Sequence, residues 1–296
     1  MRRGRSWYPF MILTAVLVII PVSYATEGSE PSYDPAAVEH YNSGVAHIEE
    51  NNFEQAIADF NAAINIESAY ADAYYGLGLA YLGIRNQTEA LEAFTQAVKA
   101  DPHHARAHFN RGKILFTQRL YQDAIDAYEK AVTNKDDYSE AFYAMGMAKK
   151  KTDDYEGALN AFTRATELDP QMAEGFYMKG STLRSLERYS EAVAAYQSAI
   201  AIDTRYAMAY YWLAETYREL GRNPEAIEAY TKAAQYDQRK FSKAYCKIGD
   251  IYYEMGSFDQ AMAQYKKMPR FDRDWYEYAQ GQIKHIQSKQ QSSTSG

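Results

Sequence analysis

Glycine recurs in this sequence every 34 residues, and this regularity constrains the fold more than any other feature. The series runs through Gly44, Gly78, Gly112, Gly146 and Gly180, and continues as Ala214 and Gly249 with one extra residue before the last. Three further series keep the same register: alanine from Ala56 to Ala261, an aromatic residue from Phe60 to Tyr265, and alanine from Ala63 to Ala233. A shared period of this length indicates an array of repeats, each of which buries its apolar surface against its neighbours.

Each repeat is predicted to form two helices joined by a short turn. In one repeat the helices are residues 139–151 and 155–168, separated by a polar turn at 152–154. Glycine inside a helix costs about 1 kcal/mol relative to alanine, so its recurrence predicts a close approach that a side chain would block. We expect Gly146 to lie against Ala158 of the second helix, and the ring of Phe162 to fill the groove toward the next repeat.

The amino terminus carries the pattern of a secretory signal. Three arginines (Arg2, Arg3 and Arg5) precede an apolar run at residues 10–20, and small residues up to Ala25 form a candidate cleavage site. The run is shorter than a membrane-spanning helix requires. We expect cleavage after Ala25 or, alternatively, retention of residues 1–25 as a short membrane anchor. Either outcome places the rest of the chain outside the cytoplasm, in a secreted or periplasmic location or on the outer face of the membrane.

Composition excludes several classes of protein. The single cysteine, Cys246, rules out an internal disulfide framework and any site with several cysteine ligands for zinc or iron–sulfur. The net charge of −7 argues against a nucleic-acid binder, which needs a basic surface. With 47 % apolar and 24 % charged residues, the chain has the composition of a folded protein.

Residues 71–104 carry the repeat pattern most fully, with apolar, small and aromatic residues at fixed positions. These residues are Tyr74, Leu77, Gly78, Tyr81, Ala90, Phe94, Ala97 and Pro102, at positions 4, 7, 8, 11, 20, 24, 27 and 32 of the repeat. This pattern resembles the tetratricopeptide repeat, and the resemblance covers residues 37–275. The sequence departs from it at His40 and His108 (position 4) and at Lys149 (position 11).

The resemblance implies an all-α fold: an α-solenoid, wound as a right-handed superhelix, of seven tandem 34-residue helix–turn–helix repeats plus a C-terminal capping helix. The predicted division is a linker at 26–36, repeats at 37–70, 71–104, 105–138, 139–172, 173–206, 207–241 and 242–275, a capping helix at 276–288 and a disordered tail at 289–296. The extra residue of the sixth repeat is expected in a loop near Asp237–Lys240, because an insertion inside a helix would rotate all later side chains.

Catalytic and cofactor motifs are absent from the sequence, which contains no P-loop, GxSxG, HExxH or CxxC. His104 and His108 have a spacing that suits a metal, but we interpret His104, with His103, as part of an exposed turn and His108 as a packing residue. Cys246 is expected to be a structural or exposed thiol. The chain is therefore predicted to be no enzyme and to need no cofactor or metal. Asn86 begins a sequon, Asn86-Gln87-Thr88, and is a weak candidate for glycosylation.

The resemblance also implies a ligand-binding face, since positions 2, 5, 9 and 12 of each first helix line a concave groove in this family. Position 5 is nearly always aromatic here, and position 12 is basic in the fourth to sixth repeats. The candidate peptide-binding residues are Tyr75, Phe109, Lys113, Tyr143, Lys150, Tyr177, Arg184, Tyr211 and Arg218. We predict a tyrosine floor with one basic edge and one partly acidic edge, the latter from Asp72, Glu140 and Glu174 at position 2. The alternative is that the position-5 rings pack sideways between neighbouring helices, and both can hold.

These features favour an exported, non-enzymatic scaffold that binds a partner protein or an extended peptide in its groove. The partner would not be a nucleic acid, and membrane contact would occur only through residues 1–25. A second hypothesis is a binder of envelope glycan or surface-layer polymer, because rows of tyrosines also stack on sugars.

Overall fold

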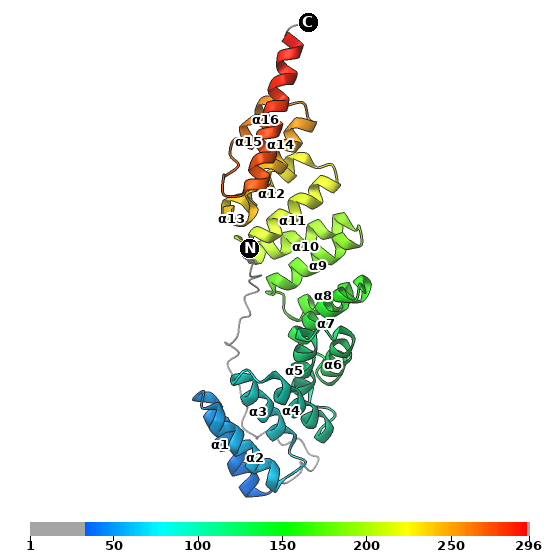
Figure 1. Cartoon of the computed structure of the whole chain (residues 1–296). Coiled ribbons are helices and arrows are strands. Elements are labelled where there is room, and N and C mark those ends of the chain that lie inside the picture. The colour runs from blue at the N-terminus through cyan, green and yellow to red at the C-terminus, as the bar shows by residue number, and fades with distance from the viewer. Residues whose placement is uncertain (1–32, 295–296) are drawn as a thin grey trace. The chain divides into compact units, whose positions relative to one another are not determined.

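Helices alone make up the part of the chain that the computed structural model describes, residues 33–294 (Figure 1). They are α1 (Pro35–Glu49), α2 (Phe53–Ile66), α3 (Ala71–Gly83), α4 (Gln87–Ala100), α5 (Ala105–Thr117), α6 (Tyr121–Asn134), α7 (Ser139–Lys151), α8 (Tyr155–Leu168), α9 (Ala173–Ser185), α10 (Tyr189–Ile202), α11 (Ala207–Glu219), α12 (Asn223–Tyr236), α13 (Gln238–Phe241), α14 (Ala244–Glu254), α15 (Phe258–Tyr265) and α16 (Arg273–Thr294). The predicted all-α class is confirmed.

Two compact units divide the chain between Ala107 and His108, inside α5. In unit 1, α1 packs on α2, α2 on α3, and α3 on α4. In unit 2, the helices of a repeat pair in the same way, and each second helix also contacts the first helix of the next repeat, as α8 does with α9 and α10 with α11. Within each unit, consecutive helix pairs therefore stack on their neighbours, as the repeat period predicts.

The recurring glycine makes room for an aromatic ring. A Cβ added at Gly146 would lie 2.8 Å from the ring of Phe162, at position 24 of the same repeat. The contact recurs in the pairs Gly44–Phe60, Gly78–Phe94, Gly112–Tyr128, Gly180–Tyr196 and Gly249–Tyr265. The ring of Phe162 thus lies against the glycine itself, and Ala158, expected to face Gly146, is fully buried.

The turn inside every repeat depends on one residue in the left-handed backbone region. This residue is at position 15 in all seven repeats: Asn51 (φ 61°), Arg85 (62°), Arg119 (65°), Asp153 (59°), Glu187 (58°), Gly221 (69°) and Gly256 (74°). A positive φ ends the first helix and redirects the chain into the second. Non-glycine residues adopt it at a conformational cost, so five repeats accept strain to keep the turn.

The extra residue of the sixth repeat lies where the sequence predicts it, between α12 and α14. The segment is not a loop, however. It forms the short helix α13, in which the Asp237 carboxylate accepts a hydrogen bond from the backbone N–H of Lys240 at 3.0 Å.

The C-terminal helix is longer than predicted. It begins at Arg273 and continues to Thr294, so residues 289–294 are helical where we predicted a disordered tail from 289 onward. Side-chain contacts explain the extension: the Lys289 ammonium lies 5.0 Å from the centroid of the Phe258 ring, and Gln290 donates a hydrogen bond to Asp259 at 3.3 Å. Ile283 and Ile286 are buried, as expected of a capping helix.

The predicted signal or anchor, residues 1–25, lies outside the described residues. Most of the predicted linker does too, although residues 35 and 36 belong to α1, whose start is capped by the Asp34 carboxylate. Within residues 33–294, no helix combines the length and the apolar character needed to cross a membrane.

We predict that Gly146→Leu destabilises the protein by about 3 kcal/mol, because leucine at position 8 must displace the Phe162 ring from a close-packed site. Ala214 shows that one methyl group can be accommodated at this position, whereas a branched side chain is much larger. Gly281→Leu is the matched control, since Gly281 is also helical but has no atom within 4 Å of an added Cβ. Urea unfolding measures both, and equal small effects would contradict the proposed role of the glycine.

Candidate functional site

The predicted ligand-binding residues lie on the first helices of the repeats. We call the surface formed by positions 2, 5, 9 and 12 of these helices the first-helix face. In unit 2 it includes Phe109 and Lys113 from α5, Tyr143 and Lys150 from α7, Tyr177 and Arg184 from α9, and Tyr211 and Arg218 from α11. Tyr75 belongs to α3 of unit 1, where its ring lies 5.7 Å from that of Phe94 and 4.9 Å from that of His104.

The position-5 rings pack sideways between other rings, as the alternative interpretation predicts. In unit 2 each lies against the position-24 ring of its own repeat, at centroid distances of 5.9 Å (Phe109–Tyr128), 5.7 Å (Tyr143–Phe162), 5.9 Å (Tyr177–Tyr196) and 5.5 Å (Tyr211–Tyr230). The last residue of the repeat adds a second ring at 4.8 Å (Phe109–Tyr138), 5.3 Å (Tyr177–Tyr206) and 5.1 Å (Tyr211–Phe241). The rings therefore hold neighbouring helices together.

Tyr211 is not part of an open floor. Its side chain is 4 % exposed, the Phe241 ring stacks on it, and the Lys243 ammonium lies 4.6 Å from its centroid. The short helix α13, which holds the extra residue, thus helps to bury the last predicted floor residue. Tyr143 and Tyr177 are half-buried, and burial raises the pKa of both to about 12, so their hydroxyls stay protonated near neutral pH.

The basic edge is largely neutralised within the protein. A guanidinium nitrogen of Arg218 lies 3.0 Å from a carboxylate oxygen of Glu254, and one of Arg184 lies 3.8 Å from Glu219. Both pairs join position 12 of one repeat to position 13 of the next, and we call them inter-repeat clasps. Arg184 also covers the Trp212 ring at 4.7 Å. Both arginines therefore have an ion-pair partner, but only Arg218 is hydrogen-bonded to its glutamate, whereas the buried Nε of Arg184 has no hydrogen-bond partner among the described residues. Whether these cations bind a ligand stays a prediction.

Lys150 is the exception at position 12. Its ammonium donates a hydrogen bond to the Ser181 hydroxyl at 2.6 Å, and no described carboxylate lies within ion-pairing distance of it. The next repeat offers Ser185 at position 13, where the later repeats have glutamate. Burial, helped by the neighbouring charge of Lys151, lowers the pKa of Lys150 to about 8.

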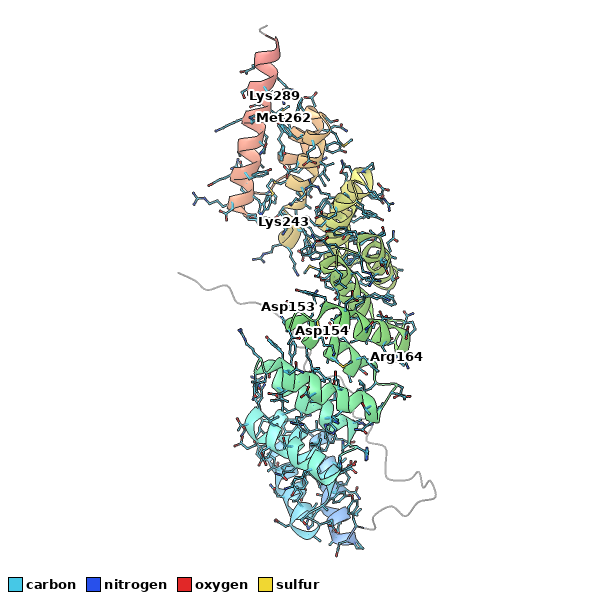
Figure 2. All side chains as sticks on the ribbon, turned by 90° about the vertical axis from the view of Figure 1, so that its right-hand side faces the viewer. Asp153, Asp154, Arg164, Lys243, Met262 and Lys289 are labelled. Carbon is cyan, nitrogen blue, oxygen red and sulfur yellow. The ribbon has the colours of Figure 1, made fainter. Side chains whose placement is uncertain are left out.

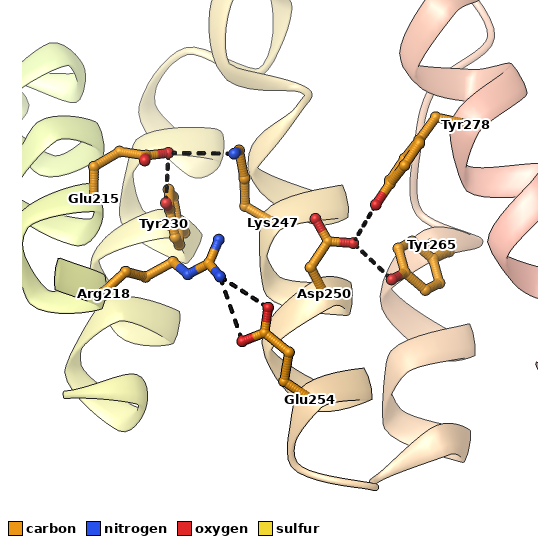
Figure 3. A network of polar contacts seen from close by, with 8 residues as sticks. All are labelled: Glu215, Arg218, Tyr230, Lys247, Asp250, Glu254, Tyr265 and Tyr278. Carbon is orange, nitrogen blue, oxygen red and sulfur yellow. Dashed lines mark hydrogen bonds and ion pairs between the residues drawn. The ribbon is translucent and has the colours of Figure 1, made fainter. Parts of the chain in front are cut away.

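A polar network closes the end of unit 2 (Figure 3). The Tyr230 hydroxyl donates to Glu215 at 2.6 Å, and Asp250 accepts hydrogen bonds from the hydroxyls of Tyr265 (2.7 Å) and Tyr278 (2.8 Å). Glu215 and Asp250 occupy position 9, and Tyr230 and Tyr265 occupy position 24. Burial raises the pKa of Tyr265 above its ordinary value, and its hydrogen bond to Asp250 adds to the shift.

The sequence contained a signal for this network that we missed. Position 24 is phenylalanine where position 9 is apolar (Val45, Leu79 and Met147) and tyrosine where position 9 is polar (Lys113, Ser181, Glu215 and Asp250). A buried hydroxyl needs a hydrogen-bonding partner, so the two positions vary together from repeat to repeat.

Metal and thiol chemistry find no support in residues 33–294. No group of three or more His, Cys, Asp or Glu side chains there could hold a metal ion. His104 instead lies 3.2 Å from Asp72 and accepts from the Ala107 N–H at 3.1 Å. Cys246 is fully buried, which raises its thiol pKa to about 12 and makes it a structural residue. Asn86 lies in the turn directly before α4, and its glycosylation stays a prediction.

The surface hollows of unit 2 include two that are open to solvent. One, of about 300 Å³, is lined by residues 187–191 with Leu220, and the other, of about 320 Å³, by Lys247, Asp250, Asp274, Trp275 and Tyr278. Neither encloses a small molecule.

Comparisons with protein families give one consistent result. Models described as "Tetratricopeptide repeat" match residues 75–139 and 139–172, and one described as "TPR repeat" matches residues 44–84, 180–221 and 214–256. Together they cover most of the chain. A comparison with curated protein sequences finds no match.

Solved structures of similar fold include several repeat proteins. MamA is 27 % identical with a TM-score of 0.53, over 55 % of this chain and 96 % of its own. YrrB, described as a TPR protein with an unusual peptide-binding site, is 24 % identical with a TM-score of 0.57, over 61 % of this chain and 93 % of its own. The C-terminal part of a TPR protein from Cytophaga hutchinsonii is 15 % identical with a TM-score of 0.66, over 80 % of this chain and 98 % of its own.

We predict that Lys150→Met makes the protein more stable than the wild type at pH 7 but not at pH 10.5. A lysine whose pKa is lowered in the folded state binds fewer protons there than in the unfolded chain, so its contribution to stability rises with pH from about 8 to 10.5. Methionine removes the unfavourable charge, a gain of roughly 1 kcal/mol at pH 7 after allowing for partial solvent exposure. Urea unfolding at both pH values measures it.

The matched control for this titration is Arg184→Met, because a guanidinium stays charged over the whole range. Its effect on stability should be the same at pH 7 and pH 10.5. A pH-independent difference between Lys150→Met and the wild type would contradict the prediction.

Proposed function

Because the chain belongs to the tetratricopeptide repeat family, we propose that it is an exported, non-enzymatic scaffold that binds a partner protein or extended peptide on the first-helix face of unit 2. The matching family models indicate no enzyme family. Helix pairs that are packed by rings and glycines form a rigid surface before any ligand arrives, so the entropic cost of ordering falls mainly on the ligand.

One observation carries this proposal. On successive first helices of unit 2, the half-buried Tyr143 and Tyr177 accompany Lys150, the position-12 cation that no clasp neutralises. Such features, repeated from helix to helix, suit an extended chain that offers side chains at intervals. The open hollows do not suit a compact small molecule. The peptide-binding site for which YrrB is described supports the analogy, at the level of the shared fold.

The glycan hypothesis receives less support from the geometry. Sugar stacking needs an open aromatic face, whereas the position-5 rings of unit 2 lie against one or two other rings and Tyr211 is buried. A peptide can contact the part of Tyr143 and Tyr177 that stays exposed.

We predict that a photo-crosslinking amino acid at Lys113, an exposed residue of the first-helix face, captures a protein partner in cells. The control is the same amino acid at Arg164, an exposed residue of α8 that lies on the other side of unit 2 from Lys243 of the seventh repeat in Figure 2. Mass spectrometry should find peptides of a second protein in the adduct at position 113 and none at position 164. Equal labelling at both positions, or carbohydrate adducts alone, would contradict the proposal.

Export is the second part of the proposal and is supported by the order of charged, apolar and small residues in 1–25. We predict that the mature protein begins at Thr26 and fractionates outside the cytoplasm. Amino-terminal sequencing of the protein from cell fractions measures this. Retention as an anchor would give an intact start at the membrane, and an intact chain in the cytosol would rule out export.

A further inference from the structure

We propose that Lys150 and Ser181 form an anchor for a carboxylate group of the ligand, at the junction of the fourth and fifth repeats. The inference rests on the proposed function, because it names the chemistry that the first-helix face recognises. It is carried by a comparison of the three basic side chains at position 12, two of which are held by carboxylates of this chain while the third is not.

The inter-repeat clasps show how a cation at position 12 is paired within this chain. Arg184 and Arg218 both reach forward to a glutamate at position 13 of the next repeat, Glu219 and Glu254. An anion that approached either arginine would have to displace an existing carboxylate, so the gain in free energy would be small. Arg218, which is hydrogen-bonded to Glu254, is therefore a poor site for a ligand, whereas Arg184 is held only by a 3.8 Å ion pair and its buried Nε has no hydrogen-bond partner in the described residues.

Lys150 makes the same approach to the next repeat but finds no carboxylate there. Position 13 of that repeat is Ser185, whose hydroxyl donates to the backbone carbonyl of Ser181 within α9. The Lys150 ammonium therefore rests on the neutral Ser181 hydroxyl at 2.6 Å. A half-buried cation with only a neutral partner gains more from a carboxylate than a paired one, because a charge-assisted hydrogen bond replaces partial hydration.

The other charged groups around the junction do not compensate Lys150. Lys149 is held by Glu129 at 3.2 Å and by Asp154 at 3.6 Å, and Lys151 adds positive charge. Glu174, the acidic residue that acts on Tyr143, lies seven residues before Ser181 on α9, about 10 Å along the helix axis. The immediate surroundings of the ammonium therefore favour an anion.

Hydroxyl groups complete the anchor. Ser181 accepts from the Lys150 ammonium at 2.6 Å and so places a hydroxyl group beside the cation. Tyr177, one turn before Ser181 on α9, remains protonated near neutral pH and can donate to an oxygen acceptor. A planar carboxylate is the anion that such a mixed ammonium and hydroxyl surface suits in a peptide.

The anchor can be tested with three N-acetylated tripeptides of tyrosine, proline and a variable third residue. The third residue is glutamate with a C-terminal amide, glutamine with an amide, or glutamine with a free C-terminal carboxylate. Binding is followed at pH 6.5 by NMR of protein labelled with ¹³C-lysine, through the Lys150 side-chain signal. We expect either carboxylate peptide to bind about fivefold more tightly than the neutral one, and the two carboxylate peptides distinguish a side-chain from a C-terminal source.

Two variants should abolish this preference in different ways. Lys150→Met removes the cation, whereas Ser185→Glu keeps it and supplies the missing glutamate at position 13, so that a clasp forms. Both should bring the charged and neutral peptides within about twofold of each other. Arg218→Met, the matched control, should leave the preference intact. For the Met variant of Lys150, the signals of the remaining lysines and a tryptophan fluorescence titration report binding, since the peptides contain no tryptophan.

The anchor is overturned if wild-type protein binds the three peptides equally or not at all, if the preference survives Lys150→Met or Ser185→Glu, or if Arg218→Met removes it as well. The proposed function fails separately, when the crosslinker at position 113 captures no protein. A protein crosslink without any carboxylate preference would leave the scaffold proposal standing and remove only the anchor.

Discussion

The contact on which the structure depends is that between the glycine at position 8 and the aromatic ring at position 24. In six of the seven repeats the ring lies so close to the glycine that an added Cβ would come within 3.0 Å of it. In five of these six repeats the ring also packs against the position-5 ring of the same repeat. One ring thus fixes the distance between the two helices and supports the side chain that faces outward, so packing in the interior determines what the first-helix face presents.

As a result, the polarity of the buried residue at position 24 is linked to that of the surface residue at position 9. Where position 24 is tyrosine, its hydroxyl needs a partner, and position 9 supplies one, as Glu215 does for Tyr230 and Asp250 for Tyr265. Position 9 also belongs to the first-helix face. The phenylalanine of the fourth repeat, Phe162, therefore accompanies an apolar position 9, whereas the sixth and seventh repeats place acids there. The distribution of charge on this face follows from the choice between two rings in the core.

The sequence predicted the helical class, the period and the position of the irregular sixth repeat, because these depend on residues whose spacing alone is informative. It failed for residues whose backbone conformation, charge pairing or burial depends on a contact with another part of the chain. Position 15 takes a left-handed backbone in every repeat, yet Arg119 and Glu187 give no local sign of it. The basic edge was predicted from Lys150, Arg184 and Arg218 without regard to the next repeat, where Glu219 and Glu254 pair with the two arginines. Tyr211 was assigned to the floor because position 5 repeats, but α13 covers it.

The clasps also explain why recognition would be concentrated at one junction. A solenoid holds together only through contacts between neighbours, so side chains at the junctions serve stability first. In the fifth and sixth repeats, the arginine at position 12 pairs with the glutamate at position 13 of the next repeat and so contributes to stability. Because residue 185 is serine, Lys150 forms no such ion pair. Its charge is therefore less well compensated, as its lowered pKa of about 8 indicates. A charged group without an ion-pair partner in its own fold gains more binding free energy from a carboxylate ligand than a paired one does. Because the arginines of the next two repeats have such partners, this difference would direct the ligand to the junction at Lys150.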